Sequence, residues 1–185
     1  FGIRAHIWTL PSGLRACLIP RPNWHHSVAL VIFRYGAIHT KARIDGRLRT
    51  FPAGVAHLLE HLLFERPNKN LFDALADLGA DANAFTSHTT TGFHFTTRTS
   101  TLRALRITLS AVQSFCAPEA SLTRERNVVL RELEGSRQNP DWRLHTTLLN
   151  ALYHRHPVKI DIVGTPESVR RITLDTLATV HRFFY

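Results

Sequence analysis

The sequence predicts an α+β domain in which a mixed β-sheet is covered by helices. Segments typical of strands lie mostly in the first half of the chain, and segments typical of helices lie mostly after them. Apolar residues make up 44% of the chain and charged residues 20%, so a substantial core can form. A length of 185 residues suits a single domain, residues 1–185, rather than two.

Strands are expected where β-branched and aromatic residues concentrate, or where apolar and polar residues alternate. These segments are residues 6–10 and 14–19, joined by a tight turn, residues 28–35, and residues 81–97 as a strand or hairpin. Residues 36–50 are polar and contain two glycines, and they predict a loop.

Helices are expected where a capping residue or a proline precedes a segment without strand-like alternation. These segments are residues 52–65, 70–78, 99–115, 118–137 and 141–154, a short helix from Thr165, and a last helix from Thr173 to the end. Gly79 is expected to stop the second of these helices.

Composition excludes several classes of protein. No segment approaches the roughly 20 uninterrupted apolar residues of a membrane span, so no membrane association is expected. The formal charge is +9, but the basic residues are scattered and lack stacking aromatics beside them, so no nucleic-acid partner is expected. Cys17 and Cys116 form no disulfide framework, and each is expected to be a small buried side chain. Without a signal segment at the start, we expect a cytoplasmic location.

The helix predicted for residues 52–65 carries a motif with metal-binding potential, His57-Leu58-Leu59-Glu60-His61. Residues at i, i+3 and i+4 share one face of a helix, so both histidines and the glutamate project together. Two imidazoles one turn apart, with a carboxylate beside them, suit a zinc ion and a general base. This H-x-x-E-H order is the inverzincin signature. The alternative is an amphipathic helix whose polar face happens to hold two histidines.

A catalytic zinc requires a third protein ligand. In the helix predicted for residues 118–137, Glu125 and Glu132 lie seven residues apart, two turns along one face. Glu132 is a candidate third ligand, and Glu125 is a candidate partner that orients a histidine. A surface ion pair with a neighbouring arginine is the alternative for Glu125. The spacing alone does not single out Glu132.

Three segments, taken in order, resemble the zinc peptidases of the pitrilysin (insulysin) family: residues 57–61 (HLLEH), 83–87 (NAFTS) and 124–132 (RERNVVLRE). Residues 139–143 and 156–165 are similar to the bacterial YmfH-type branch, and the likeness covers nearly the whole chain. The resemblance implies the N-terminal catalytic half of such an enzyme, with the fold of the mitochondrial-processing-peptidase-like metallohydrolases. It stops where the family's domain would add a last strand.

The resemblance also implies a role for each motif residue. It implies that His57, His61 and Glu132 bind one zinc ion per chain. Glu60 becomes the general base that takes a proton from water. Glu125 becomes an auxiliary acid or a partner of a zinc ligand.

A substrate-binding edge follows from the same resemblance. Asn83 falls at the family's active-site asparagine, beside an edge strand to which a peptide substrate adds by β-augmentation. In this chain that strand would be Ala84, Phe85 and Thr86. His88 lies close to the segment and is a candidate for a substrate contact. Without the resemblance, Asn83 reads as an ordinary turn or cap residue.

The resemblance implies a zinc-dependent endopeptidase domain acting on peptides or small unfolded proteins. Family members close a second homologous half or subunit over the substrate, and these 185 residues make one half at most. The chain starts at Phe1 and contains no Met, so we expect a longer protein. One alternative is a noncatalytic peptide-binding or scaffold subunit, although such halves usually lose the H-x-x-E-H residues. A nucleic-acid-binding module is supported only by the net charge.

Overall fold

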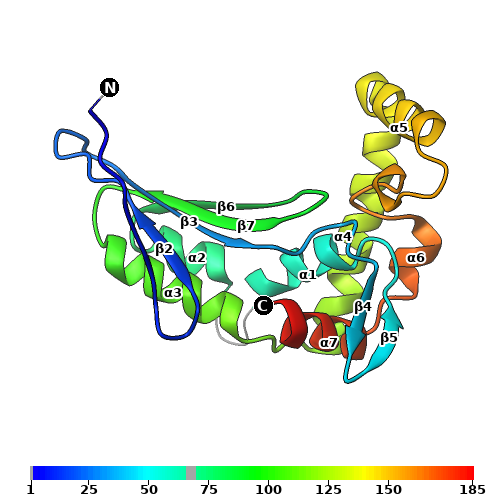
Figure 1. Cartoon of the computed structure of the whole chain (residues 1–185), viewed down its shortest axis with the longest axis horizontal. Coiled ribbons are helices and arrows are strands. Elements are labelled where there is room, and N and C mark those ends of the chain that lie inside the picture. The colour runs from blue at the N-terminus through cyan, green and yellow to red at the C-terminus, as the bar shows by residue number, and fades with distance from the viewer. Residues whose placement is uncertain (1, 66–69) are drawn as a thin grey trace.

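The computed structural model describes residues 2–65 and 70–185. Its main sheet has three antiparallel strands in the order β3-β7-β6, which places β6 at an edge (Figure 1). The bounds of these strands are Ser27–Phe33 for β3, Ala80–Thr86 for β6 and Thr91–Thr97 for β7. Strands β6 and β7 form the hairpin expected within residues 81–97.

Two separate hairpins accompany this sheet. Strands β1 (His6–Thr9) and β2 (Arg15–Leu18) form the expected first hairpin. The expectation of a loop over residues 36–50 is wrong, because β4 (Lys41–Ile44) and β5 (Arg47–Thr50) pair there. The turn between them is Asp45-Gly46, with φ of 50° and 75°. Positive φ at both positions is what a two-residue type I′ hairpin turn requires.

The α+β class is confirmed, but the sheet differs from the expected mixed sheet in one respect. Every strand pair in the described residues is antiparallel, and the strands form three sheets. Short turns join β1 to β2, β4 to β5 and β6 to β7, and a short turn imposes antiparallel pairing. Strands β3 and β6 run in the same direction, but β7 lies between them and pairs with both.

The expected helices are present. Their bounds are Val55–Phe64 for α1, Leu71–Ala76 for α2, Thr101–Gln113 for α3, Glu119–Gln138 for α4, Pro140–Leu152 for α5, Pro166–Arg170 for α6 and Leu174–Phe184 for α7, with a 3-10 turn η1 at Pro157–Lys159. Asn139 ends α4, and its side chain caps α5 by accepting from the backbone N–H groups of Asp141 and Trp142. Thr165 and Thr173 cap α6 and α7 in the same way.

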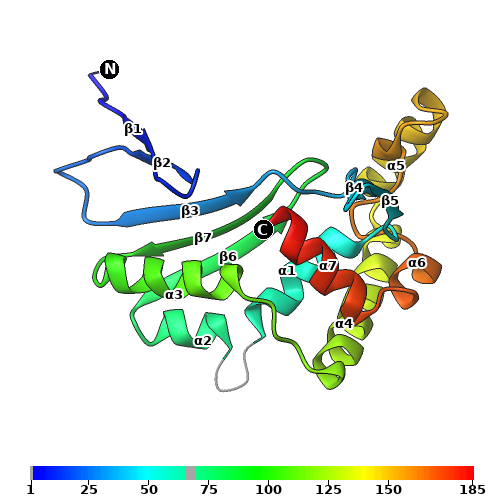
Figure 2. The same ribbon diagram turned by 60° about the horizontal axis from the view of Figure 1, so that its bottom comes forward.

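The helices cover one face of the main sheet. Figure 2 shows α1, α2, α3 and α7 beneath the sheet, while α5 projects from the far end of α4. The inward face of the sheet carries Phe93 and Phe95, both 1% exposed. The other face is open: Val28, Leu30 and Ile32 of β3 are 66%, 49% and 52% exposed. The core therefore lies between the sheet and α1.

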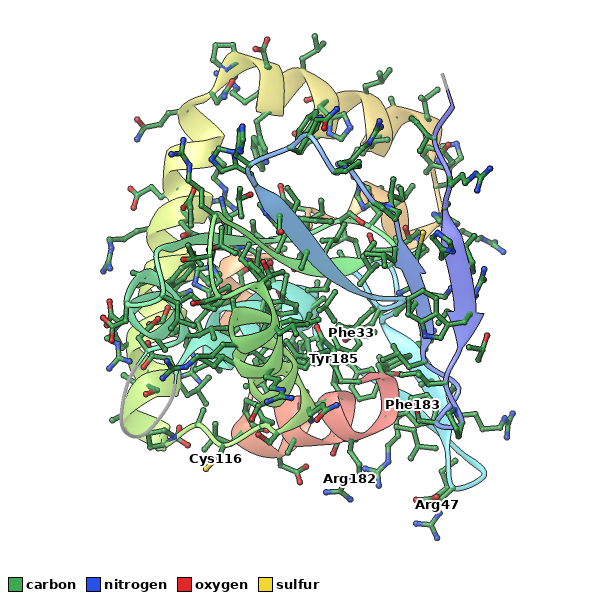
Figure 3. The ribbon with its side chains drawn as sticks, turned by 90° about the vertical axis from the view of Figure 1, so that its left-hand side faces the viewer. Phe33, Arg47, Cys116, Arg182, Phe183 and Tyr185 are labelled. Atoms are coloured by element: carbon green, nitrogen blue, oxygen red, sulfur yellow. The ribbon has the colours of Figure 1, made fainter. Side chains whose placement is uncertain are left out.

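Helix α7 brings the last residues of the chain beside the end of β3. The rings of Phe33 and Tyr185 are stacked with centroids 4.1 Å apart (Figure 3).

Cys17 and Cys116 are both free and exposed, so the expectation that they are buried is wrong. Cys17 lies on β2, where three of the four residues are exposed, and Cys116 lies between α3 and α4, at the periphery of the molecule in Figure 3. None of the helices in the described part of the chain combines the length and hydropathy of a membrane-spanning segment.

Candidate metal centre

Helix α1 carries the H-x-x-E-H motif through the middle of the domain. The apolar side chains of this helix are buried: Val55, Ala56, Leu58, Leu59, Leu62, Leu63 and Phe64. Packing against the sheet and against α3, α4 and α7 holds the helix in one orientation. His57, Glu60 and His61 then occupy the remaining face, as the spacing predicts.

The start of α1 is set by a close contact between two loops. Gly54, directly before the helix, has a φ of 88°, and a Cβ there would lie 2.4 Å from the carbonyl oxygen of Val163. Gly164 has a φ of 91°, and a Cβ there would lie 2.6 Å from the carbonyl oxygen of Ala53. These two glycines allow the backbones to meet. His57 follows Gly54 by three residues, so this contact positions a candidate ligand.

Helix α4 brings Glu132 to the two histidines. Glu132 Oε2 lies 3.8 Å from His57 Nε2 and 3.6 Å from His61 Nε2. One ligand atom from each residue lies within 4.8 Å of the others. A tetrahedral zinc with bonds of about 2.0–2.1 Å separates its ligand atoms by about 3.3 Å. Two imidazole nitrogens and one carboxylate oxygen at these separations therefore fit a zinc ion.

Glu125 lies behind His61, on the side away from Glu132. His61 Nδ1 donates to Glu125 Oε2 over 3.2 Å. An ionised carboxylate can only accept, so Nδ1 carries the proton and Nε2 is left with its lone pair. That lone pair is on the nitrogen nearest Glu132. The contact between Glu125 and a histidine, expected from the sequence, is therefore present.

His57 is held neutral by its surroundings. Burial, and then the nearby His61, lower the pKa of His57 from 6.5 to about 3. A neutral imidazole is the form that binds a metal ion. His57 Nδ1 is buried and has no hydrogen-bond partner among the described residues, in contrast to His61 Nδ1. Of the two candidate histidine ligands, His61 is therefore oriented by a hydrogen bond, whereas His57 is held by packing.

Glu60 is the one buried carboxylate of this face, with 8% of its surface exposed. Thr86 Oγ1 donates to Glu60 Oε2 over 2.5 Å. Burial raises the pKa of Glu60, the Thr86 bond and His61 oppose that rise, and Glu132 adds to it. A carboxylate with a raised pKa is a stronger base than an ordinary glutamate.

The end of β6 lies beside Glu60. Because β6 is an edge strand, its outer side has no strand partner in the described ranges. Thr86 turns toward Glu60, Ala84 is half-buried, and Phe85 is 41% exposed. Asn83 is exposed, and its Oδ1 accepts from the backbone N–H of Ala84 over 2.8 Å. No hydrogen bond described in residues 2–65 and 70–185 joins Asn83 to Glu60 or to the metal-donor atoms, so its catalytic role stays a prediction.

A cavity of about 370 Å³ opens beside Glu60, and we name it the α5 cavity. Its walls come from the end of β6, from α5 and from residues 158–163. Phe85, Trp142 and Leu149 supply apolar surface to it. A cavity of this size next to a candidate general base can hold one amino-acid side chain.

Sequence reasoning missed most of this cavity. Trp142 and Leu149 of α5 carried no signal beyond the capped helix, because no motif links α5 to the histidines. His88, the candidate substrate contact, does line the cavity, and its Nδ1 is buried without a hydrogen-bond partner in the part of the chain described. The hydrogen bond from Thr86 to Glu60 was also unforeseen.

Comparison with known proteins gives one family. The sequence model of "Insulinase (Peptidase family M16)" matches residues 50–166, which is more than half of the chain and includes every metal-donor residue named above. The Bacillus subtilis protein YmfH, named an uncharacterized zinc protease, is 34% identical over 95% of this chain and 42% of its own length. An uncharacterized zinc protease of Mycobacterium leprae is 32% identical over 94% of this chain and 38% of its own length.

Solved structures agree in fold. An M16-like peptidase of Alicyclobacillus acidocaldarius superimposes with a TM-score of 0.96 at 35% identity, over all of this chain and 44% of that one. An M16 domain from Pseudomonas fluorescens, named inactive, has a TM-score of 0.81 at 24% identity over 96% of this chain and 43% of that one. The chain thus spans about two fifths of the length of these relatives.

Proposed function

The chain belongs to the insulinase family of peptidases, family M16, and from this premise we propose that it is the zinc-binding half of an endopeptidase. Its substrates are peptides or small unfolded proteins. The observation that carries the proposal is the convergence of donor atoms from His57, His61 and Glu132 beside the buried Glu60.

His57, His61 and Glu132 would hold one zinc ion per chain. When bound, zinc supplies a Lewis acid and lowers the pKa of water toward about 7. Two neutral imidazoles and one carboxylate leave such a site a net positive charge. Glu132 is 44% exposed, so solvent and substrate can reach the donor cluster from its side.

Glu60 is the general base in this proposal. Its raised pKa favours acceptance of a proton from the attacking water near neutral pH. The same carboxyl group then donates that proton to the leaving amine. Thr86 holds one oxygen of Glu60 in place, which leaves the other oxygen to handle the proton. Glu125 orients His61 and keeps its Nε2 free.

The substrate binds as an added strand along Ala84, Phe85 and Thr86. The free edge of β6 can form main-chain hydrogen bonds with an extended peptide, which provides affinity without sequence specificity. One substrate side chain enters the α5 cavity, where Phe85, Trp142 and Leu149 favour a bulky apolar group. Asn83, at the start of this segment, contacts the peptide backbone.

A second homologous half completes the enzyme. The relatives are more than twice as long as this chain, which supports a partner half supplied in cis or in trans. We expect the 185-residue chain to bind zinc but to cleave peptides poorly by itself. The whole enzyme is expected to act in the cytoplasm, where two free exposed cysteines remain reduced.

Zinc content per chain, measured by elemental mass spectrometry, tests the proposal. The parent should hold about one zinc, Glu132→Gln should lose it, and Glu60→Gln should retain it while losing hydrolysis of quenched peptides. Supplying the second half should raise kcat/KM of the parent by orders of magnitude.

A noncatalytic peptide-binding subunit is the competing function. Failure of the reconstituted parent to bind zinc would overturn the endopeptidase proposal. Zinc binding without hydrolysis, even with the second half present, would favour the binding subunit.

A further inference from the structure

The support of His61 does not end at Glu125. Arg124 Nε donates to Glu125 Oε1 over 3.3 Å, while the other oxygen, Oε2, accepts from His61. The two oxygens of Glu125 are thus committed in different directions, one toward the metal-donor cluster and one away from it. Fixing both oxygens sets the rotation of the carboxylate plane.

Arg124 is itself anchored by Glu65. The Nη2 group of Arg124 donates to Glu65 Oε2 and, over 3.3 Å, to Ser121 Oγ. Glu65 also accepts from Asn70 Nδ2 over 3.2 Å and from Ser121 Oγ over 3.4 Å. One guanidinium group therefore joins two carboxylates, which its planar fork of donors suits.

Glu65 and Arg124 sit on the two helices that carry the metal donors. Glu65 caps the C-terminal end of α1, one turn after His61, and Arg124 lies near the start of α4, two turns before Glu132. An ion pair between them ties the end of α1 to the first turns of α4. The link therefore holds the Arg124 guanidinium in a fixed place relative to the end of α1, where it contacts Glu125 Oε1.

We propose that Arg124, anchored by Glu65, is a positioning residue that fixes the Glu125 carboxylate so that His61 presents Nε2 to the metal. This inference rests on the proposed zinc site. It adds two residues, Arg124 and Glu65, neither of which touches the donor atoms. Arg124 acts only through Glu125.

A role in stability alone would leave a different signature. The side chain of Arg124 is 53% exposed, and an exposed ion pair contributes little to folding. The side chain of Glu125 is only 13% exposed, so water can replace a lost partner of its carboxylate less easily. Loss of Arg124 should therefore weaken metal binding much more than it destabilises the fold.

A mutant cycle on the 185-residue chain separates these roles. The dissociation constant for Zn²⁺ is measured by competition with a chromophoric chelator for the parent, Arg124→Gln, Glu125→Ala and the double variant. Glu125→Ala should weaken binding by about 10- to 100-fold, as loss of a partner of a metal ligand does. Arg124→Gln, one contact further away, should weaken it by about 3- to 10-fold in the parent. In the Glu125→Ala background, Arg124→Gln should weaken Zn²⁺ binding by less than about a further twofold.

Two further variants complete the design. Glu65→Gln removes the anchor while leaving Arg124 and Glu125 in place, and it should weaken binding in the same direction. Arg137→Gln, on the last turn of α4, is the matched control, because the charge of Arg137 acts on Glu167 of α6 and not on Glu65 or Glu125, so Zn²⁺ binding should be unchanged. The Tm of each metal-free variant should stay within about 3 °C of the parent.

Three results would overturn the inference. The first is unchanged Zn²⁺ affinity in Arg124→Gln, and the second is an equal loss in both backgrounds. The third is a fall in metal-free Tm large enough to account for the weaker binding. Absence of zinc from the parent would instead refute the proposed function.

Discussion

Replacing Gly54 by alanine tests how the start of α1, the helix that carries His57, Glu60 and His61, is positioned. Gly54 has a φ of 88°, and left-handed backbone costs a residue with a Cβ about 1–2 kcal/mol. The new Cβ would also lie 2.4 Å from the Val163 carbonyl oxygen and 3.2 Å from Val169 Cγ2. Overpacking of this kind costs about 1–3 kcal/mol more, since a backbone carbonyl cannot rotate away. We therefore expect a total loss of about 2–5 kcal/mol.

Two other glycines separate these contributions. Gly79 has a φ of 67°, but a Cβ there meets nothing within 4 Å, so Gly79→Ala should cost only the backbone part, about 1–2 kcal/mol. Gly135 lies inside α4 with open space around it, and Gly135→Ala should stabilise the fold by about 0.5–1 kcal/mol.

Urea unfolding of the metal-free chain at pH 7.5 measures the free energy of unfolding of all three variants. Zn²⁺ affinity is measured alongside, because displacement of Gly54 moves His57, three residues later. Gly54→Ala should lose both stability and metal affinity, whereas Gly79→Ala should lose stability alone. If Gly54→Ala costs the same as Gly79→Ala to within about 0.5 kcal/mol, the loop contact does not position α1.

Three further predictions concern the titrating groups of the site. Thr86→Val removes a hydrogen bond that lowers the pKa of Glu60, so the acidic limb of the profile of kcat/KM against pH should move to higher pH. If that limb does not move, Glu60 is not the base. Burial raises the pKa of Glu60 above its ordinary value of 4.5. The protonated Glu60 carboxyl therefore contributes fully to stability below pH 4.5, and this contribution is lost as pH rises through the pKa of the folded state. Metal-free Glu60→Gln should therefore resist urea better than the parent at pH 8, with the advantage disappearing near pH 4.5. The pKa of His57 is lowered from 6.5 to about 3, so its stabilising contribution is present above pH 6.5 and is lost as pH falls toward 3. At pH 5 this loss is about 2 kcal/mol of unfolding free energy, and His57→Gln should not show it. If the free energy of unfolding of the parent and of His57→Gln falls equally between about pH 7.5 and pH 5, the role of His57 is refuted.

The sequence predicts the candidate metal centre better than its surroundings. His57, Glu60 and His61 lie within one helical turn, so helical periodicity alone places them on a common face. The pairing of Glu125 with Glu132 on one face of α4 also follows from periodicity. Which histidine Glu125 contacts depends on the packing of α1 against α4, which no local pattern encodes.

Features built from distant segments could not be predicted. The β4–β5 hairpin was not predicted because each strand is only four residues long and carries two basic residues, although Lys41–Ile44 alternates polar with apolar residues and Asp45-Gly46 is a hairpin signal. The α5 cavity joins β6 to residues 158–163, some 70 positions later in the chain. The link from Glu65 to Arg124 likewise spans 59 positions, and neither residue is unusual at the end of a helix.

The open face of β3 has a practical consequence for work with this chain. Residues 28–33 read Val-Ala-Leu-Val-Ile-Phe, without charge, proline or glycine, and β3 pairs only with β7 in the described ranges. Such a segment at a sheet edge is a template for intermolecular β-pairing and aggregation. Preparations of the isolated chain should therefore become turbid as concentration rises. A lysine in place of Leu30, whose side chain points into solvent, would act as a gatekeeper against this self-association without entering the core.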